Sequence, residues 1–173
     1  MIGTLADRYR RWFDYEKDSH ARVLASLNSV PEAGRSTPAF ARAMTLMAHL
    51  VAARRLWLFR FGVTSKGPSA GEFFPNDVTL PALAQGIRDV EAQWTSYLER
   101  LEDTELARTF EYESLDGGRY RNTIEDTLTQ LFGHSWYHRG QIASLVRQAG
   151  GEPAVTDLVF WAREAVAAPT VKK

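Results

Sequence analysis

Cysteine is absent from the 173 residues of this chain. Its absence excludes disulfide bonds, thiolate metal ligands and a cysteine nucleophile. Any thiol chemistry would therefore need a thiol that is brought by the substrate.

The chain also lacks an excess of either charge. Its 21 Lys and Arg residues balance 21 Asp and Glu residues, so the formal net charge is zero. A neutral chain has no general electrostatic attraction to nucleic acid or to an anionic membrane. Long apolar runs are missing too, since none approaches the roughly 20 residues that span a bilayer, and the first residues lack the apolar core of a signal peptide. We therefore expect a soluble cytoplasmic protein without a nucleic-acid or membrane partner.

What is present is enough hydrophobic sequence for one core. Hydrophobic residues make up 45 % of the chain, and its length fits one domain. We expect residues 1–168 to form a single helical domain and residues 169–173 to form a loose tail.

Apolar residues recur at helical spacing through most of the chain. The pattern predicts helices over residues 4–29, 37–62, 79–101 and 122–149, and a last helix that begins near 156–157 and includes Val166. Residues 109–121 instead alternate and turn, which predicts a short hairpin. The fold class is therefore all-α: an up-down four-helix bundle with a short β-hairpin before the long fourth helix and an extra C-terminal helix.

Two histidines four residues apart are the most informative feature of the sequence. His134 and His138 would lie about 40° apart on one face of the long helix. Two neutral imidazoles so placed can bind one metal ion, and a third from another helix would complete a three-histidine site with open positions. His49, on an apolar stretch of the second predicted helix, is the natural third ligand. The predicted metal ligands are therefore His49, His134 and His138, and no catalytic side chain is assigned.

Several other residues are expected to have structural roles, at the surface or in the core, and no role in metal binding. Ser135 occupies the place of the zinc-peptidase glutamate, so peptide hydrolysis by that route is not supported. His20 is expected at the surface and not among the metal ligands, and Arg54 with Arg55 is expected on a solvated face. Three tryptophans on apolar stripes are assigned to the core: Trp57, Trp94 and Trp161.

The run Tyr137-His138-Arg139-Gly140-Gln141-Ile142, with His134 four residues earlier, resembles the most recognisable stretch of the DinB-like family (DinB/YfiT four-helix metalloenzymes). His49 followed by Arg55-Leu56-Trp57-Leu58 is similar to the second-helix motif of that family. Thr156-Asp157-Leu158-Val159 is similar to its closing segment. The likeness covers nearly the whole chain. The chain departs from the family at Asp18, His20 and Arg54, which leaves the three ligand positions intact.

The resemblance implies a function as well as a fold. It implies that residues 1–168 are a DinB-like domain in which His49, His134 and His138 are a metal triad, and that the protein is a homodimer. Some relatives transfer a low-molecular-weight thiol to an electrophile. We therefore expect a metal-dependent enzyme with a divalent ion, zinc or nickel first and iron or manganese next, and a thiol S-transferase activity in detoxification. Its partner would be a small-molecule substrate, specifically a low-molecular-weight thiol.

Two other functions stay open. One is a metal-dependent hydrolase that uses metal-bound hydroxide. The other is a non-catalytic, metal-stabilised, stress-related binding protein. For a catalytic site, the predicted rim consists of Asp14 and Asp18, the loop Glu72 to Asn76, and Tyr137 or Arg139.

Overall fold

The computed structural model describes residues 3–166. A threonine caps the start of each of its four long helices. The helices are α1 (Leu5–Asn28), α3 (Pro38–Arg60), α4 (Leu80–Glu99) and α6 (Ile124–Gln148). The residue before each is Thr4, Thr37, Thr79 or Thr123, and its side-chain oxygen accepts a hydrogen bond from the backbone N–H three residues later. Such a cap stabilises a helix by about 1 kcal/mol. The predicted helix starts are confirmed to within a residue or two.

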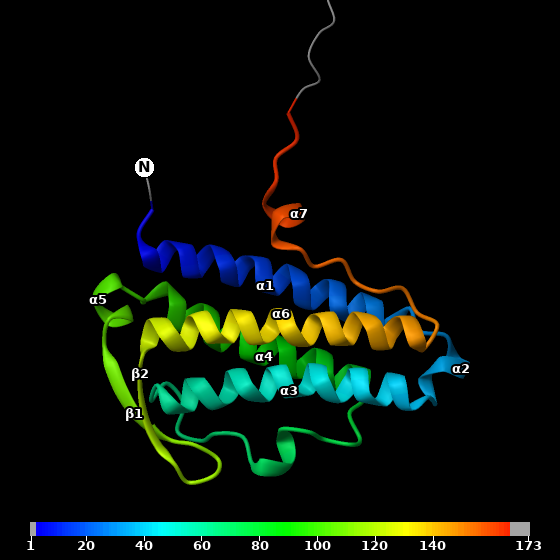
Figure 1. Ribbon diagram of the computed structural model, residues 1–173, viewed down its shortest axis with the longest axis horizontal. Coiled ribbons are helices and arrows are strands. Elements are labelled where there is room, and N and C mark those ends of the chain that lie inside the picture. Colours follow the sequence, from blue (N-terminus) through cyan, green and yellow to red (C-terminus); the bar gives the residue numbers. More distant parts are fainter. Residues whose placement is uncertain (1–2, 167–173) are drawn as a thin grey trace, which may run out of the picture.

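The four long helices lie side by side (Figure 1). α1 packs against α4 and α6, and α3 packs against the same two helices. Between them lies the core, with Trp94, Leu27 and Met47 fully buried. None of the helices within residues 3–166 is both long and apolar enough to cross a membrane.

The predicted hairpin directly precedes the longest helix. Strands β1 (Thr109–Glu113) and β2 (Arg119–Thr123) pair antiparallel, with Thr109 opposite Thr123 and Glu113 opposite Arg119. The short elements η1 (Ala70–Glu72), α2 (Glu32–Arg35) and α5 (Asp103–Leu106) fill the other connections. The prediction of a mainly helical chain with one hairpin is therefore confirmed.

The last helix is shorter than predicted. Helix α7 covers Leu158–Ala162, and the backbone of Arg163 is already extended, so Val166 is not helical. Val159 and Phe160 are 64 % and 52 % exposed. A helix this short gains stability mainly from burying an apolar face, and this one buries too little to continue. The predicted loose tail, residues 169–173, lies outside the described residues.

The segment between α6 and α7 turns back along α1. Gly150 has φ of +83°, which ends α6 in a left-handed turn that suits glycine. The chain is then attached to α1, because the Ser26 hydroxyl donates to the Glu152 carbonyl at 2.6 Å and the Tyr15 hydroxyl donates to the Thr156 carbonyl. Residues 154–158 are thereby placed between α1 and α6.

Candidate metal centre

Helices α3 and α6 bring together the three predicted ligands. One ring nitrogen from each of His49, His134 and His138 lies within 4.8 Å of the other two. The His49 and His134 Nε2 atoms are 3.1 Å apart, although 85 residues separate them in sequence. The rings of His134 and His138 are 4.5 Å apart, as the i,i+4 spacing predicts. Of the histidine and acidic side chains of residues 3–166, these three histidines are the group whose geometry can hold a metal ion.

The hydrogen bonds of two rings leave one nitrogen of each free for a ligand bond. His49 Nδ1 lies 3.1 Å from the Phe73 carbonyl oxygen, which can only accept, so Nδ1 carries the proton. The Nε2 of a neutral His49 ring is then an unprotonated electron-pair donor. His138 Nδ1 lies 2.7 Å from Gln141 Oε1 in the same kind of contact. Such bonds to the second nitrogen also fix the orientation of metal-binding imidazoles.

This donor set fits a divalent ion. Two nitrogens bound to zinc at tetrahedral geometry lie about 3.4 Å apart, close to the 3.1 Å between His49 and His134. The carboxylates of the described residues do not join the cluster, so three neutral imidazoles form the set. Imidazole suits zinc and nickel well.

Burial favours the neutral form of two of these imidazoles, His134 and His49. Burial, together with the neighbouring His138, His49 and Arg54 charges, lowers the pKa of His134 to about 4, against a small opposite effect of Glu16. Burial also lowers the pKa of His49, assisted by His138 and Arg42. Unprotonated rings can bind a metal without first losing a proton.

Aromatic residues of the loop and of α6 border the triad. The Phe74 ring stacks on His49 at 4.4 Å and 9°, and Tyr137 lies edge-on to His138 at 5.1 Å. Phe74 is 51 % and Tyr137 65 % exposed. Phe74, from the 72–76 loop, and Tyr137 therefore lie beside the three histidines.

The other predicted rim residues lie elsewhere. Asp14 and Asp18 form ion pairs with Lys17 and Arg22 on α1 itself, and Asp18 lines a cavity beside residues 155–163. Arg139 points away, because consecutive helical residues differ by about 100° in direction. Its guanidinium instead contacts Tyr15 on α1.

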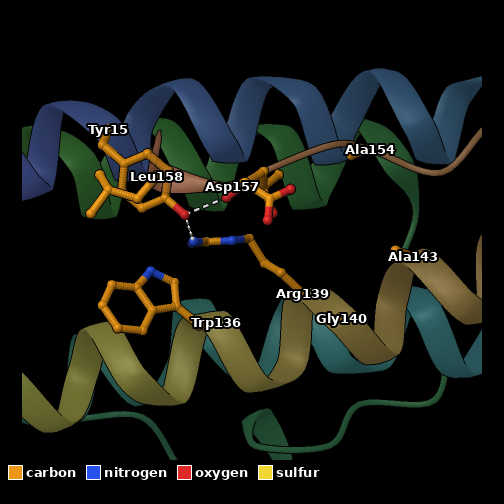
Figure 2. A pocket seen from close by; sticks show the side chains of 9 residues that line it. Tyr15, Trp136, Arg139, Gly140, Ala143, Ala154, Asp157 and Leu158 are labelled. Atoms are coloured by element: carbon orange, nitrogen blue, oxygen red, sulfur yellow. Dashed lines mark hydrogen bonds between the residues drawn. The ribbon is translucent and has the colours of Figure 1, made fainter. Parts of the chain in front are cut away.

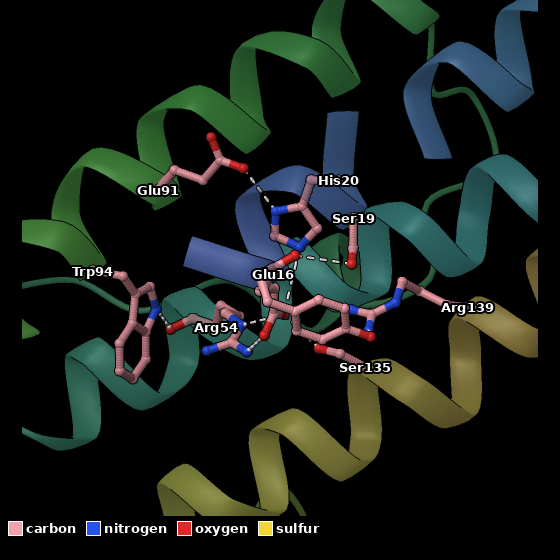
Figure 3. Close-up of polar contacts among 9 residues, drawn as sticks. Glu16, Ser19, His20, Arg54, Glu91, Trp94, Ser135 and Arg139 are labelled. Carbon is pink, nitrogen blue, oxygen red and sulfur yellow. Dashed lines mark hydrogen bonds and ion pairs between the residues drawn. The ribbon is translucent and has the colours of Figure 1, made fainter. Parts of the chain in front are cut away.

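A buried polar network lies beside the triad, and sequence reasoning missed it (Figure 3). Glu16 is fully buried and accepts hydrogen bonds from Arg54 Nε at 3.1 Å, from Arg54 Nη2, and from the Ser135 hydroxyl at 2.7 Å. His20 lies between two carboxylates, 3.5 Å from Glu16 and 2.8 Å from Glu91. Because Ser135 directly precedes Trp136 and follows His134, the network supports the α6 turn that carries the first ligand of the pair.

The network ionises Glu16 in spite of its burial. Burial alone would raise the pKa of this carboxyl, but the Arg54 charge and the hydrogen bonds from His20 and Arg54 outweigh that effect and hold the pKa well below its usual range. Burial likewise opposes protonation of His20, yet hydrogen bonds to Glu16 and Glu91 raise its pKa.

The surface assignments of His20 and Arg54 were therefore wrong. Both side chains are only 3 % exposed. Their polar sequence neighbours suggested solvent, but their positions on the helical stripes indicated the core. In α1 the buried stripe runs at alternating spacings of four and three residues: Tyr9, Phe13, Glu16, His20, Val23 and Leu27. In α3, Arg54 continues a similar stripe from Met47 and Val51 to Leu58.

His20 lies outside the group formed by His49, His134 and His138, and its ring contacts Glu16 and Glu91 instead. Of the three tryptophans assigned to the core, Trp94 is fully buried, and its indole N–H donates to the Arg54 carbonyl at 3.2 Å. Trp57 and Trp161 are half-buried: Trp57 packs against Phe110, and Trp161 against Tyr15.

Comparison with known proteins agrees with the likeness read from the sequence. A sequence model of the DinB family matches residues 5–170. The crystal structure of a DinB-like protein from Bacillus cereus ATCC 10987 superposes with a TM-score of 0.67 at 22 % identity, covering 90 % of this chain and 99 % of that chain. That level of identity shows the fold alone. No curated protein matches the chain.

Proposed function

The chain belongs to the DinB family, and we propose that it is a metal-dependent enzyme that transfers a low-molecular-weight thiol to an electrophile. The observation that carries the proposal is the convergence of His49, from α3, with His134 and His138, from α6, within 4.8 Å. Membership of the family does not by itself name a reaction, so the chemistry of the donor set and its surroundings has to support one.

A divalent ion held by three neutral imidazoles would keep its full +2 charge and an open position, and would favour the thiolate form of a bound thiol. The chain supplies the conditions for this. Phe73 and Gln141 orient two rings through their second nitrogens. The absence of cysteine means that no thiol of the protein competes for the ion.

The surroundings of the triad suit a small ligand with an apolar part. All three rings are half-buried, so the triad is accessible from one side. The exposed rings of Phe74 and Tyr137 lie beside that opening and offer apolar surface to an electrophilic substrate. A small-molecule substrate, a homodimer and a cytoplasmic location belong to the same proposal.

The two alternatives receive less support. A metal-dependent hydrolase needs a general base near the ion, and the carboxylates of the described residues lie outside the cluster. Glu16 is directed into the core, where Arg54 and Ser135 already bind it. A purely structural metal would favour a closed site, whereas these rings are partly accessible.

Metal content tests the first part of the proposal. Protein purified without an affinity tag should contain about one divalent ion per chain, and His134→Ala should lose it. His20→Gln changes the fourth histidine of the chain, which lies outside the triad, and is the matched control once circular dichroism confirms its fold. Equal metal content in all three proteins would overturn the assignment of the triad.

Thiol binding tests the second part. In the cobalt-substituted protein, 2-mercaptoethanol should produce a sulfur-to-metal charge-transfer band in the near ultraviolet, and ethanol should not. Acetate and phosphate serve as the competing probes. If these anions change the cobalt spectrum and the thiol does not, the transferase proposal is wrong and a hydrolase is favoured.

A further inference from the structure

A cavity lies on the other side of α6 from the triad. Its volume is about 430 Å³, and its lining comes from α1, α6 and residues 154–158. None of the three triad histidines lines it. The separation has a simple cause: His138 and Arg139 are consecutive on α6 and therefore point about 100° apart, the histidine toward α3 and the arginine toward α1.

Arg139 is the residue that gives this cavity a chemistry. Its side chain is only 3 % exposed and extends from α6 toward Tyr15, with the Trp136 indole beside it (Figure 2). One guanidinium nitrogen, Nη2, donates to the Tyr15 hydroxyl at 2.6 Å, and the guanidinium lies 5.1 Å from the centre of the Tyr15 ring. The Tyr15 hydroxyl in turn donates a hydrogen bond to the Thr156 carbonyl.

The rest of the guanidinium has no acceptor within the described part of the chain. Nε and Nη1 are both buried and make no hydrogen bond to any of residues 3–166. An arginine cannot lose its charge in a protein, and leaving buried charged donors unpaired is costly. Arg54 shows the contrast, since its guanidinium is equally buried and is paired with Glu16. The unpaired donors of Arg139 therefore point to a ligand with acceptor oxygens.

The other lining residues select the kind of anion. Asp157 lines the same cavity, but within residues 3–166 it forms no ion pair with Arg139. Its negative charge disfavours a phosphate dianion more than a monoanion. Trp136 offers an aromatic wall, and Gly140 faces open space, since an added Cβ would meet nothing within 4 Å. The cavity therefore has one cationic donor group, an apolar wall and room for a small molecule.

We propose that this cavity binds a small organic monocarboxylate, with the carboxylate on Arg139 and the apolar body against Trp136. Arginine binds planar carboxylates with two parallel hydrogen bonds, and Nη2 keeps a second N–H for such a pair with Nε or Nη1. The site is independent of the metal triad, because its lining includes neither the histidines nor their hydrogen-bond partners.

Benzoate is a suitable probe, because it combines a carboxylate with an aromatic body, and benzamide is its neutral isostere. Binding to the full chain is measured by isothermal titration and by ligand-observed NMR. We expect benzoate to bind one to one and to bind at least about tenfold more weakly to Arg139→Met. Arg147→Met, which removes an exposed arginine of the same helix, is the matched control and should bind like the unchanged chain. Benzamide should not bind.

Four further measurements keep the proposal falsifiable if Arg139→Met does not fold. Asp157→Asn changes an exposed residue and should tighten benzoate binding. Excess chelator and His138→Ala should leave benzoate binding unchanged, whereas the thiol signal of the proposed function depends on both. Phosphate should bind more weakly than benzoate.

The proposal is overturned if benzoate binds equally well without Arg139, if it does not bind at millimolar concentration, or if phosphate binds more tightly. Loss of benzoate binding on chelation would place the ligand at the triad and would also overturn it.

Discussion

The buried ion pair between Glu16 and Arg54 offers the sharpest test of how the core supports the metal centre. The change is Arg54→Met, which removes the charge and keeps an apolar side chain of similar length. Glu16, fully buried, would then keep only Ser135 and His20 as partners. Removing one member of a buried pair costs about 3–5 kcal/mol, because the other charge is left uncompensated.

That cost predicts a large change in melting temperature. For a chain of this size, 1 kcal/mol corresponds to a shift of about 2–4 °C. Arg54→Met should therefore lower the melting temperature by about 6–20 °C. Urea unfolding followed by circular dichroism gives the free energy of unfolding, with chelator present throughout so that metal binding does not contribute.

The neighbouring arginine is the matched control. Arg55 forms an exposed ion pair with Glu72 at 2.8 Å, with side chains 46 % and 45 % exposed. Such pairs contribute about 0–1 kcal/mol, so Arg55→Met should change the melting temperature by no more than about 4 °C.

A double-mutant cycle separates the pair from the rest of the network. Glu16→Gln alone should also be destabilising, but Glu16→Gln with Arg54→Met should cost clearly less than the sum of the single changes, since neither charge is left unpaired. If the two costs add, or if Arg54→Met costs less than about 1 kcal/mol, the two residues are not a coupled buried pair and our reasoning is refuted.

Four other predictions follow from the structure. Chelation should lower the melting temperature by about 5–11 °C if the ion is present at a hundred times its dissociation constant, and His138→Ala should abolish this difference; identical curves with and without chelator would contradict it. The depressed pKa of Glu16 contributes stability that is present above its ordinary value of 4.5 and is lost as the pH falls below that value, so acid unfolding curves should show a weaker pH dependence in Glu16→Gln. Gly34→Ala should cost about 1–3 kcal/mol, because the added Cβ would lie 2.0 Å from the Ala149 carbonyl oxygen. Gly133→Ala, where nothing lies within 4 Å, should instead stabilise α6 by about 1 kcal/mol in urea unfolding.

Local signals in the sequence were sufficient for the four long helices and for two of the three histidines of the metal centre. Threonine caps and apolar periodicity place the long helices, since capping and amphipathic spacing are properties of neighbouring residues. The pairing of His134 with His138 follows from helix geometry alone. The same signals failed at α7, because a five-residue helix depends on what it packs against.

The helical spacing of Glu16, His20 and Arg54 indicated burial, but polar residues next to them in the sequence suggested exposure to solvent. Their spacing on apolar stripes was the better indicator, since periodicity describes a face of a helix and immediate neighbours do not. Only the packing of α1 against α3, α4 and α6 supplies the partners that make three buried polar groups acceptable in one core.

The sequence by itself determined that two imidazoles share a face of α6 and that no thiol of the protein can compete with them. Only the tertiary structure decided that His49 meets them from 85 residues away, because contacts between helices depend on how the whole core packs. It also decided the direction of Arg139. Helix geometry turns this arginine about 100° from its histidine neighbour, but the position of α1 and residues 154–158 is what encloses it beside a cavity.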